Sequence, residues 1–164
     1  MTLTELVAID PFVWKSVGVA ILCGCIVGFE RQLRGKPVGI RTSALITLGT
    51  YIFIAASIHV QTDATDPSRI IGQVITGIGF LGAGVMLARD GVILGVTSAA
   101  TIWALAAVGV CIAVGYPATA IKLSLVIVVL LVGVDALEDY SQALTRGVHR
   151  KYQGWREKTK PGSQ

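Results

Sequence analysis

The sequence predicts an all-α fold, a polytopic membrane helix bundle with five transmembrane helices and a short cytoplasmic tail. Hydrophobic residues make up 53% of the chain and charged residues only 15%, whereas a soluble domain carries about 25% charged residues. Five apolar runs each approach the ~20 residues that cross a hydrocarbon core of about 30 Å. The 19 glycines are typical of close helix contacts in lipid.

The five predicted spans cover residues 12–29, 42–60, 70–88, 95–116 and 118–137, within one membrane domain of residues 1–137. Lipid cannot satisfy open strand edges, and no run alternates as barrel strands do, so the spans are expected to be helices. No basic residue precedes the first run, which predicts a retained helix and not a cleaved signal peptide. The predicted links are Glu30–Arg41, Gln61–Arg69, Arg89–Gly91 and the position of Pro117.

The basic residues are distributed unevenly between the two sides of these spans. The first link holds four, the third holds Arg89 and the tail holds six, together eleven of the 14 lysines and arginines. Lysine and arginine are enriched in cytoplasmic loops. The N-terminus is therefore expected outside and the C-terminus in the cytoplasm.

The tail, residues 138–164, is basic and has a helical stripe of apolar residues. One interpretation is an amphipathic helix on the anionic membrane surface, followed by disorder. The other is a frayed, charged end, because Gly147 and Gly154 weaken a helix. Both interpretations stay open at this stage.

Small residues recur within the spans at spacings that bring helices together in lipid. Gly77, Gly79 and Gly82 also match the glycine spacing of a dinucleotide-binding turn. That interpretation is rejected, because the motif needs a preceding strand and a following helix N-terminus. The predicted helix-packing positions are Gly24, Gly28, Gly72, Gly77, Gly79, Gly82, Gly84, Ala100 and Trp103.

Polar residues near membrane depth are the candidates for function, because they are costly to keep there. Glu30 and Arg41 are expected to pair across the first link. A purely structural alternative stays open. In it, the hydroxyls of Thr97, Ser98 and Thr101 serve only to join helices, and the charged residues serve only to set the topology. The candidate functional site consists of Glu30, Arg31, Arg34, Arg41, Thr42, Gln73, Thr97 and Thr101.

No pattern of catalytic or metal-binding residues emerges from the sequence. No nucleophile and base stand at a catalytic spacing, and no cysteine–histidine cluster has zinc spacing. The three cysteines, Cys23, Cys25 and Cys111, lie in apolar runs and are expected to be packed thiols. We therefore expect neither enzyme activity, nor a cofactor or metal, nor nucleic-acid binding.

Three motifs in this order resemble the MgtC/SapB family of bacterial inner-membrane proteins. They are GFERQLRGKPVGIRTSALITLG, SRIIGQVITGIGFLGAGVML and GVTSAATIWALAAVGVCIAVG. The resemblance covers roughly residues 10–135. It implies an inner-membrane protein associated with magnesium limitation and with virulence or survival inside host cells. Many members carry a C-terminal soluble domain, which the short tail after Leu137 predicts to be absent.

The resemblance implies a regulator, because some family members act as inhibitory partners of the membrane ATP synthase. The first hypothesis is therefore a non-enzymatic regulator that contacts another integral membrane protein. The alternative is an oligomeric transporter or channel for magnesium or another small solute, since so short a chain forms a pathway only by association. The expected partners are the lipid bilayer and either another membrane protein or further copies of this chain.

Overall fold

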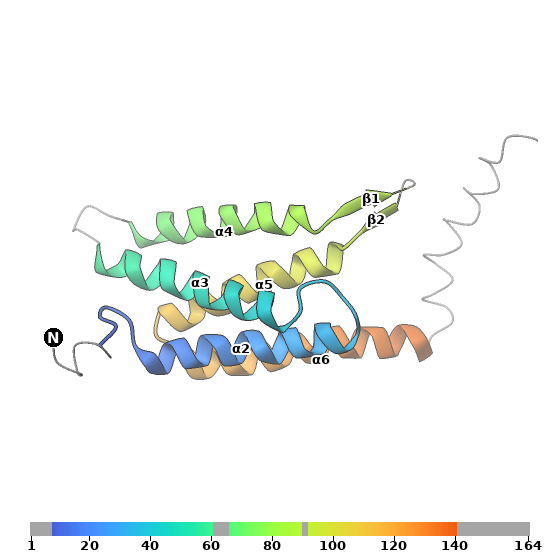
Figure 1. Cartoon of the computed structure of the whole chain (residues 1–164), viewed down its shortest axis with the longest axis horizontal. Helices are drawn as coiled ribbons and strands as arrows, with labels where there is room; N and C mark the ends of the chain where they lie inside the picture. The colour runs from blue at the N-terminus through green and yellow to red at the C-terminus, as the bar shows by residue number, and fades with distance from the viewer. Residues whose placement is uncertain (1–7, 61–65, 90–91, 141–164) are drawn as a thin grey trace, which may run out of the picture. The chain divides into compact units, whose positions relative to one another are not determined.

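The computed structural model describes residues 8–60, 66–89 and 92–140, so most of the tail lies outside the described residues. These residues form five helices and one small hairpin, which confirms the predicted helical class (Figure 1). The helices are α2 (Trp14–Leu33), α3 (Ile40–His59), α4 (Pro67–Gly84), α5 (Val96–Ala113) and α6 (Pro117–Tyr140). The strands are β1 (Leu87–Arg89) and β2 (Val92–Leu94).

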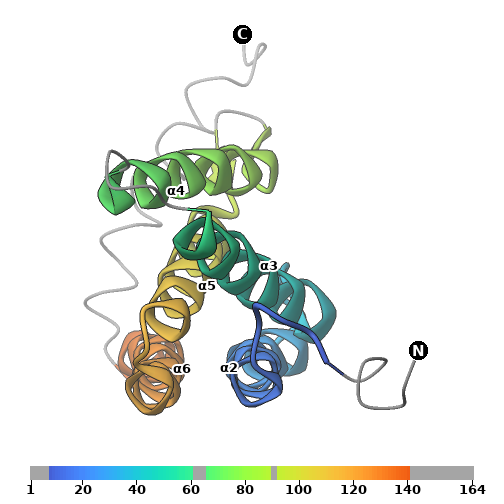
Figure 2. The same cartoon turned by 90° about the vertical axis from the view of Figure 1, so that its left-hand side faces the viewer.

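The chain divides into two compact units, residues 1–128 and 129–164. Within the first unit, successive helices run in alternating directions along a common axis (Figure 1). Seen along that axis, α3 and α5 lie between α4 on one side and α2 on the other (Figure 2). The described part of the second unit is the C-terminal end of α6.

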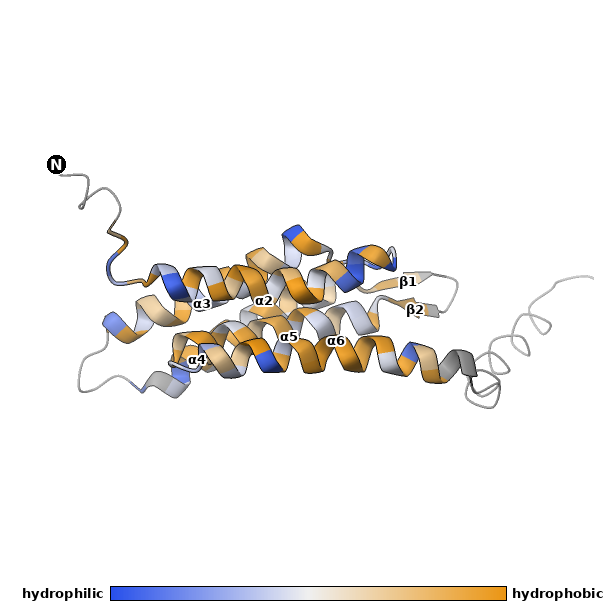
Figure 3. Cartoon of the chain, turned by 90° about the horizontal axis from the view of Figure 1, so that it is seen from below, coloured by the Kyte–Doolittle hydropathy of each residue, from blue (hydrophilic) through white to orange (hydrophobic). Residues whose placement is uncertain are grey.

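Four of the described helices, α2, α3, α5 and α6, are long and apolar enough to cross a membrane. Hydrophobic residues cover most of their length (Figure 3). α4 runs beside them but is not in this group, since it carries Arg69, Gln73, Thr76 and five glycines. Its N-terminal end is capped by Asp66, which accepts a 2.9 Å hydrogen bond from the Ser68 N–H. Hydrogen bonds from Ser68 hold the pKa of the Asp66 carboxyl below its usual value.

Backbone contact between α2 and α3 forms the tightest part of the first unit. A Cβ added at Gly24 would lie 2.5 Å from Ala44 Cα, and one at Gly28 would lie 2.6 Å from Ile40 Cα. Only glycine permits this approach. The adjoining core consists of Ala20, Cys23, Tyr51, Ala55, Val108, Ile112 and Ala120. All three cysteines are free thiols.

Most of the other predicted packing positions lie on the surface of the described chain. Gly82 is in ordinary contact with Ala99, at 3.6 Å from a built Cβ to the Ala99 carbonyl oxygen. Ala100 and Trp103 are exposed in this chain, so their role in helix packing stays a prediction about contact with a partner. The same holds for a set of α4 glycines whose built Cβ meets nothing within 4 Å in this chain, namely Gly72, Gly77, Gly79 and Gly84.

The third predicted span ends four residues too late, because α4 stops at Gly84 and the chain enters the hairpin. β1 and β2 pair antiparallel, with Leu87 opposite Leu94. The sequence has Asp-Gly directly after Arg89, and this pair is a common signal for a hairpin connection. Gly95 then adopts a left-handed φ of 88° before α5 begins.

Replacing Gly95 with alanine is expected to lower the free energy of unfolding by about 2 kcal/mol or more. A side chain in the left-handed region costs about 1–2 kcal/mol, and a Cβ here would also strike the Val85 carbonyl oxygen. Thermal unfolding of the purified chain in detergent measures the change. The control is Gly84→Ala, where a Cβ meets nothing within 4 Å. Equal stability of the two variants would contradict the strained junction.

Candidate functional site

The first charged segment is partly helical. α2 continues to Leu33, so Glu30 and Arg31 lie in its last two turns and the connection to α3 is only residues 34–39. This corrects the predicted link, which began at Glu30. One hydrogen bond fixes the connection to α3, from Ser43 Oγ to the Val38 carbonyl at 3.0 Å, and another joins the start of α3 to the end of α2, from Ile40 N–H to Gln32 Oε1 at 3.3 Å.

Two charged side chains are buried at this end of α2. Glu30 is 7% exposed and Arg31 is 4% exposed. Arg31 Nη2 donates a 2.7 Å hydrogen bond to Ser98 Oγ, which is buried in the first turn of α5. We call Glu30, Arg31, Arg34 and Ser98 the inner polar cluster. It joins α2 to α5 by a charge-assisted bond, one of the stronger kinds of hydrogen bond.

Glu30 pairs with Arg34 and not with Arg41 as the sequence predicted. Arg34 Nε lies 2.9 Å from Glu30 Oε1, one helical turn away, and the Arg34 side chain is 32% exposed. The two atoms are close enough for an ion pair, but the N–H is not aligned for a hydrogen bond. Among the described residues, neither Glu30 oxygen nor Arg31 Nε has a hydrogen-bond partner. Buried charges left incompletely bonded are costly, which marks this cluster as the candidate site.

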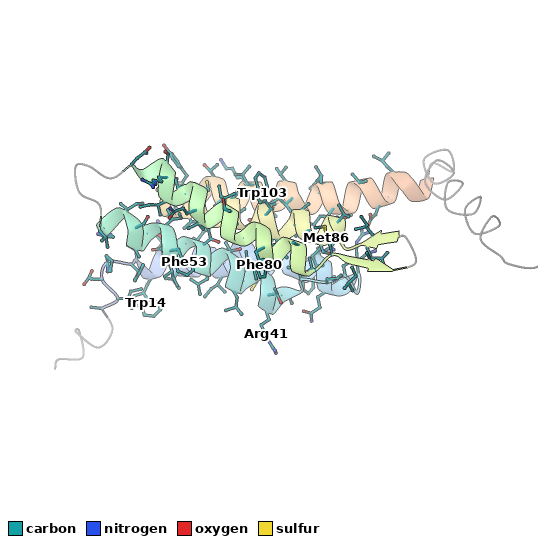
Figure 4. All side chains as sticks on the ribbon, turned by 90° about the horizontal axis from the view of Figure 1, so that it is seen from above. Trp14, Arg41, Phe53, Phe80, Met86 and Trp103 are labelled. Carbon is teal, nitrogen blue, oxygen red and sulfur yellow. The ribbon has the colours of Figure 1, made fainter. Side chains whose placement is uncertain are left out.

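A second group of predicted site residues lines a groove between α3 and α4. Arg41 and Thr42 stand at one end of this groove, and Gln73 stands at the other. Figure 4 shows the Arg41 side chain extending away from the bundle. The groove has a volume of about 590 Å³, and the remaining lining residues are Leu45, Ile46, Gly49, Thr50, Phe53, Val74, Gly77, Ile78 and Leu81.

The predicted hydroxyls of α5 divide between its surface and its interior. Thr97 is exposed, and Thr101 is buried with its Oγ1 donating to the Thr97 carbonyl at 2.8 Å. Thr101 therefore satisfies its own helix and does not reach another. Of these three hydroxyls, that of Ser98 reaches another helix, and the predicted site does not include it.

The inner polar cluster has two guanidinium groups and one carboxylate, so its formal charge is positive. Among the described residues, no group of three or more histidine, cysteine, aspartate or glutamate side chains is gathered. Magnesium prefers several oxygen ligands, including carboxylates. This arrangement is better suited to holding α2 and α5 together, or to meeting a negatively charged group, than to binding a divalent cation.

Comparison with known proteins finds one family and several relatives. The model of the MgtC family matches residues 17–140. The putative magnesium transporter YhiD of Escherichia coli is 45% identical over 111 residues, which are 63% of this chain and 51% of that protein. The MgtC protein of Salmonella typhimurium is 39% identical over 108 residues, 66% of this chain and 46% of that protein.

An uncharacterised protein of Haemophilus influenzae is 37% identical over 155 residues, which are 89% of this chain and 62% of that protein. The chain thus spans roughly half to three fifths of the length of these curated relatives. No solved structure matches.

Proposed function

The chain belongs to the MgtC family, and we propose that it is a regulatory protein of the bacterial inner membrane that acts by contact with another membrane complex. The family resemblance suggests adaptation to low magnesium as its physiological setting. It also suggests the ATP synthase as the partner to test first, and survival inside host cells as a phenotype. The proposed orientation keeps the N-terminus outside and the C-terminus in the cytoplasm.

The outer face of α4 carries this proposal. Gly72, Thr76, Gly79 and Ala83 are all exposed and recur at spacings of four, three and four, so they form one stripe along the helix. A Cβ added at Gly72 or Gly79 would meet nothing within 4 Å. The Thr76 hydroxyl donates to the Gly72 carbonyl at 2.8 Å, so it stays satisfied in lipid. Such a stripe allows close approach of a partner helix, the usual basis of association in membranes.

The composition of α4 supports the same interpretation. Among the described helices, α4 is the one that is not in the group long and apolar enough to cross a membrane. A partner helix against its outer face would shield Thr76 and the glycine backbone from lipid. Contact with a partner thus accounts for a feature that packing within this chain leaves unexplained.

The alternative function is transport of magnesium or another small solute by an oligomer. One relative carries the name of a putative magnesium transporter, which favours this alternative. The ion pair of Glu30 with Arg34 opposes it, since the guanidinium charge would repel a divalent cation. Magnesium flux into proteoliposomes that is lost in Glu30→Ala would replace the regulatory proposal with transport.

Gly79→Leu is expected to reduce recovery of the ATP synthase with this chain by about tenfold, which corresponds to about 1.4 kcal/mol of binding free energy. A leucine on the stripe would hold the two helices apart. The measurement is co-purification of the full chain from bacterial membranes with a gentle detergent, together with growth on low-magnesium medium.

The matched control is Gly18→Leu on α2, because Gly18 is also exposed with nothing within 4 Å of a built Cβ. It should leave recovery of the ATP synthase and growth unchanged. If Gly79→Leu recovered as much ATP synthase as the native chain, the stripe would not be the contact surface. Absence of any partner with the native chain would contradict the proposed function itself.

A further inference from the structure

The groove between α3 and α4 has a polar end, an apolar middle and a second polar end. Because the two helices are antiparallel, Arg41 and Thr42 share one end with Leu81, and Thr50 and Phe53 share the other with Gln73. Between these ends the walls are formed by leucine, isoleucine, valine and glycine. A Cβ added at Gly49 or Gly77 would meet nothing within 4 Å, so the middle of the groove is open.

The apolar middle has the depth of one membrane leaflet. Thr50 lies nine positions after Arg41, and a helix rises about 1.5 Å per residue, which gives about 13.5 Å. Half of a hydrocarbon core of about 30 Å is about 15 Å. If α3 crosses the membrane, Arg41 lies at the interface and Thr50 lies near the midplane.

The interfacial end of the groove is positively charged. Arg41 is exposed in the first turn of α3, and its side chain has no hydrogen-bond or ion-pair partner within the part of the chain that the structure describes. The free N–H groups and positive dipole end of a helix N-terminus add to the attraction for anions. This end is also the one that the distribution of basic residues predicts to be cytoplasmic, where the leaflet is rich in anionic lipids.

We propose that the groove binds one anionic phospholipid. The headgroup phosphate accepts hydrogen bonds from the Arg41 guanidinium and the Thr42 hydroxyl. One acyl chain lies between α3 and α4 along Leu45, Gly49 and Gly77, and ends before the polar pair of Thr50 and Gln73. This site goes beyond the proposed partner contact, because it uses the inner flank of α4 and not its outer stripe.

Charge and polarity distinguish this occupant from two others. A second copy packed symmetrically across the groove would bring two Arg41 side chains together, and like charges repel. A free phosphate would use Arg41 but would leave the apolar middle uncovered. A phospholipid matches both the cation and the apolar length.

The test is native mass spectrometry of the full chain purified in a neutral detergent and incubated with phosphatidylglycerol or phosphatidylcholine of the same acyl chains. Native protein should bind phosphatidylglycerol about tenfold better. Arg41→Gln should reduce this preference to about one, whereas Arg69→Gln should keep it, since Arg69 is exposed at the opposite end of α4. Inorganic phosphate should displace neither lipid.

Two variants fill the groove without changing Arg41. Gly77→Leu and Leu45→Trp should each lower binding of both lipids by about tenfold, and Gly18→Leu should not. Leu45 is 62% exposed, so its replacement tests the groove even if Gly77→Leu unfolds. Equal binding of the two lipids by native protein, displacement by phosphate, or unchanged binding in Leu45→Trp would each overturn the proposal. Loss of the partner in the co-purification experiment would leave these lipid measurements unaffected.

Discussion

Gly24→Val is expected to lower the free energy of unfolding by about 3 kcal/mol, and it could prevent folding altogether. A Cβ at Gly24 would lie 2.5 Å from Ala44 Cα and 2.7 Å from both Ala44 N and Ser43 O. All three atoms belong to the backbone of α3, so no side-chain rotation relieves the contact. The helices would have to separate, and overpacking of this kind costs about 1–3 kcal/mol or more. Unfolding by increasing amounts of a denaturing detergent measures the loss.

The matched control for this prediction is Gly18→Val on the same helix. Gly18 has nothing within 4 Å of a built Cβ, so the substitution should change the free energy of unfolding by less than about 1 kcal/mol. An intermediate variant, Gly24→Ala, should fall between the two, since it adds the clashing atom alone. Equal stability of Gly24→Val and Gly18→Val would contradict the close backbone contact between α2 and α3 at Gly24.

The sequence predicted the helices well because hydropathy measures a property of each run by itself. It could not tell which glycines pack within the bundle. Gly24 and Gly79 each belong to a pair of small residues four apart, yet the first lies against the α3 backbone and the second faces outward. That difference depends on which helix faces which, and one helix's pattern does not contain it. Gly109, which approaches the Thr47 carbonyl oxygen at 2.6 Å from a built Cβ, was not predicted as a packing position.

The prediction for the partner of Glu30 was wrong because it placed the end of the first helix at the end of the apolar run, at residue 29. α2 continues past Glu30 and Arg31 to Leu33, and Gly35, just beyond the helix, has a left-handed φ of 62°. The Lys36 N–H bonds the Arg31 carbonyl at 2.9 Å, and the Gly35 N–H bonds the Gln32 carbonyl at 3.1 Å. A glycine after a helix end is a common termination signal. Reading Gly35 in that way would have placed Glu30 and Arg34 one turn apart on a helix.

The contribution of Ser98 could not be predicted in the same way. Thr97, Ser98 and Thr101 are equivalent candidates in sequence, since each hydroxyl can bond its own helix or a neighbour. Only the direction that α5 faces selects Ser98, which lies 2.7 Å from Arg31 Nη2. The sequence therefore showed which charged residues gather at the site. It did not show which hydrogen-bond and ion-pair partners they have.

Arg31→Ala is expected to lower the free energy of unfolding by about 1.5–3 kcal/mol, the usual contribution of a hydrogen bond in which one partner is charged. Arg31 is 4% exposed, and its removal takes away the hydrogen bond to Ser98 and leaves the Ser98 hydroxyl buried without that partner. The same unfolding titration in detergent measures the loss. Arg31→Lys should recover only part of it, because an ammonium group lacks the planar geometry and reach of the guanidinium.

Arg34→Ala is the matched control for Arg31→Ala, since both remove an arginine that neighbours Glu30. The Arg34 side chain is 32% exposed, so its ion pair with Glu30 is screened and should contribute no more than about 1 kcal/mol. Ser98→Ala should cost less than Arg31→Ala and more than Arg34→Ala, because it leaves a buried guanidinium with one donor unpaired. If Arg34→Ala were the more damaging of the two arginine variants, the ion pair with Glu30 would hold this end of α2, and the link to α5 through Ser98 would be secondary.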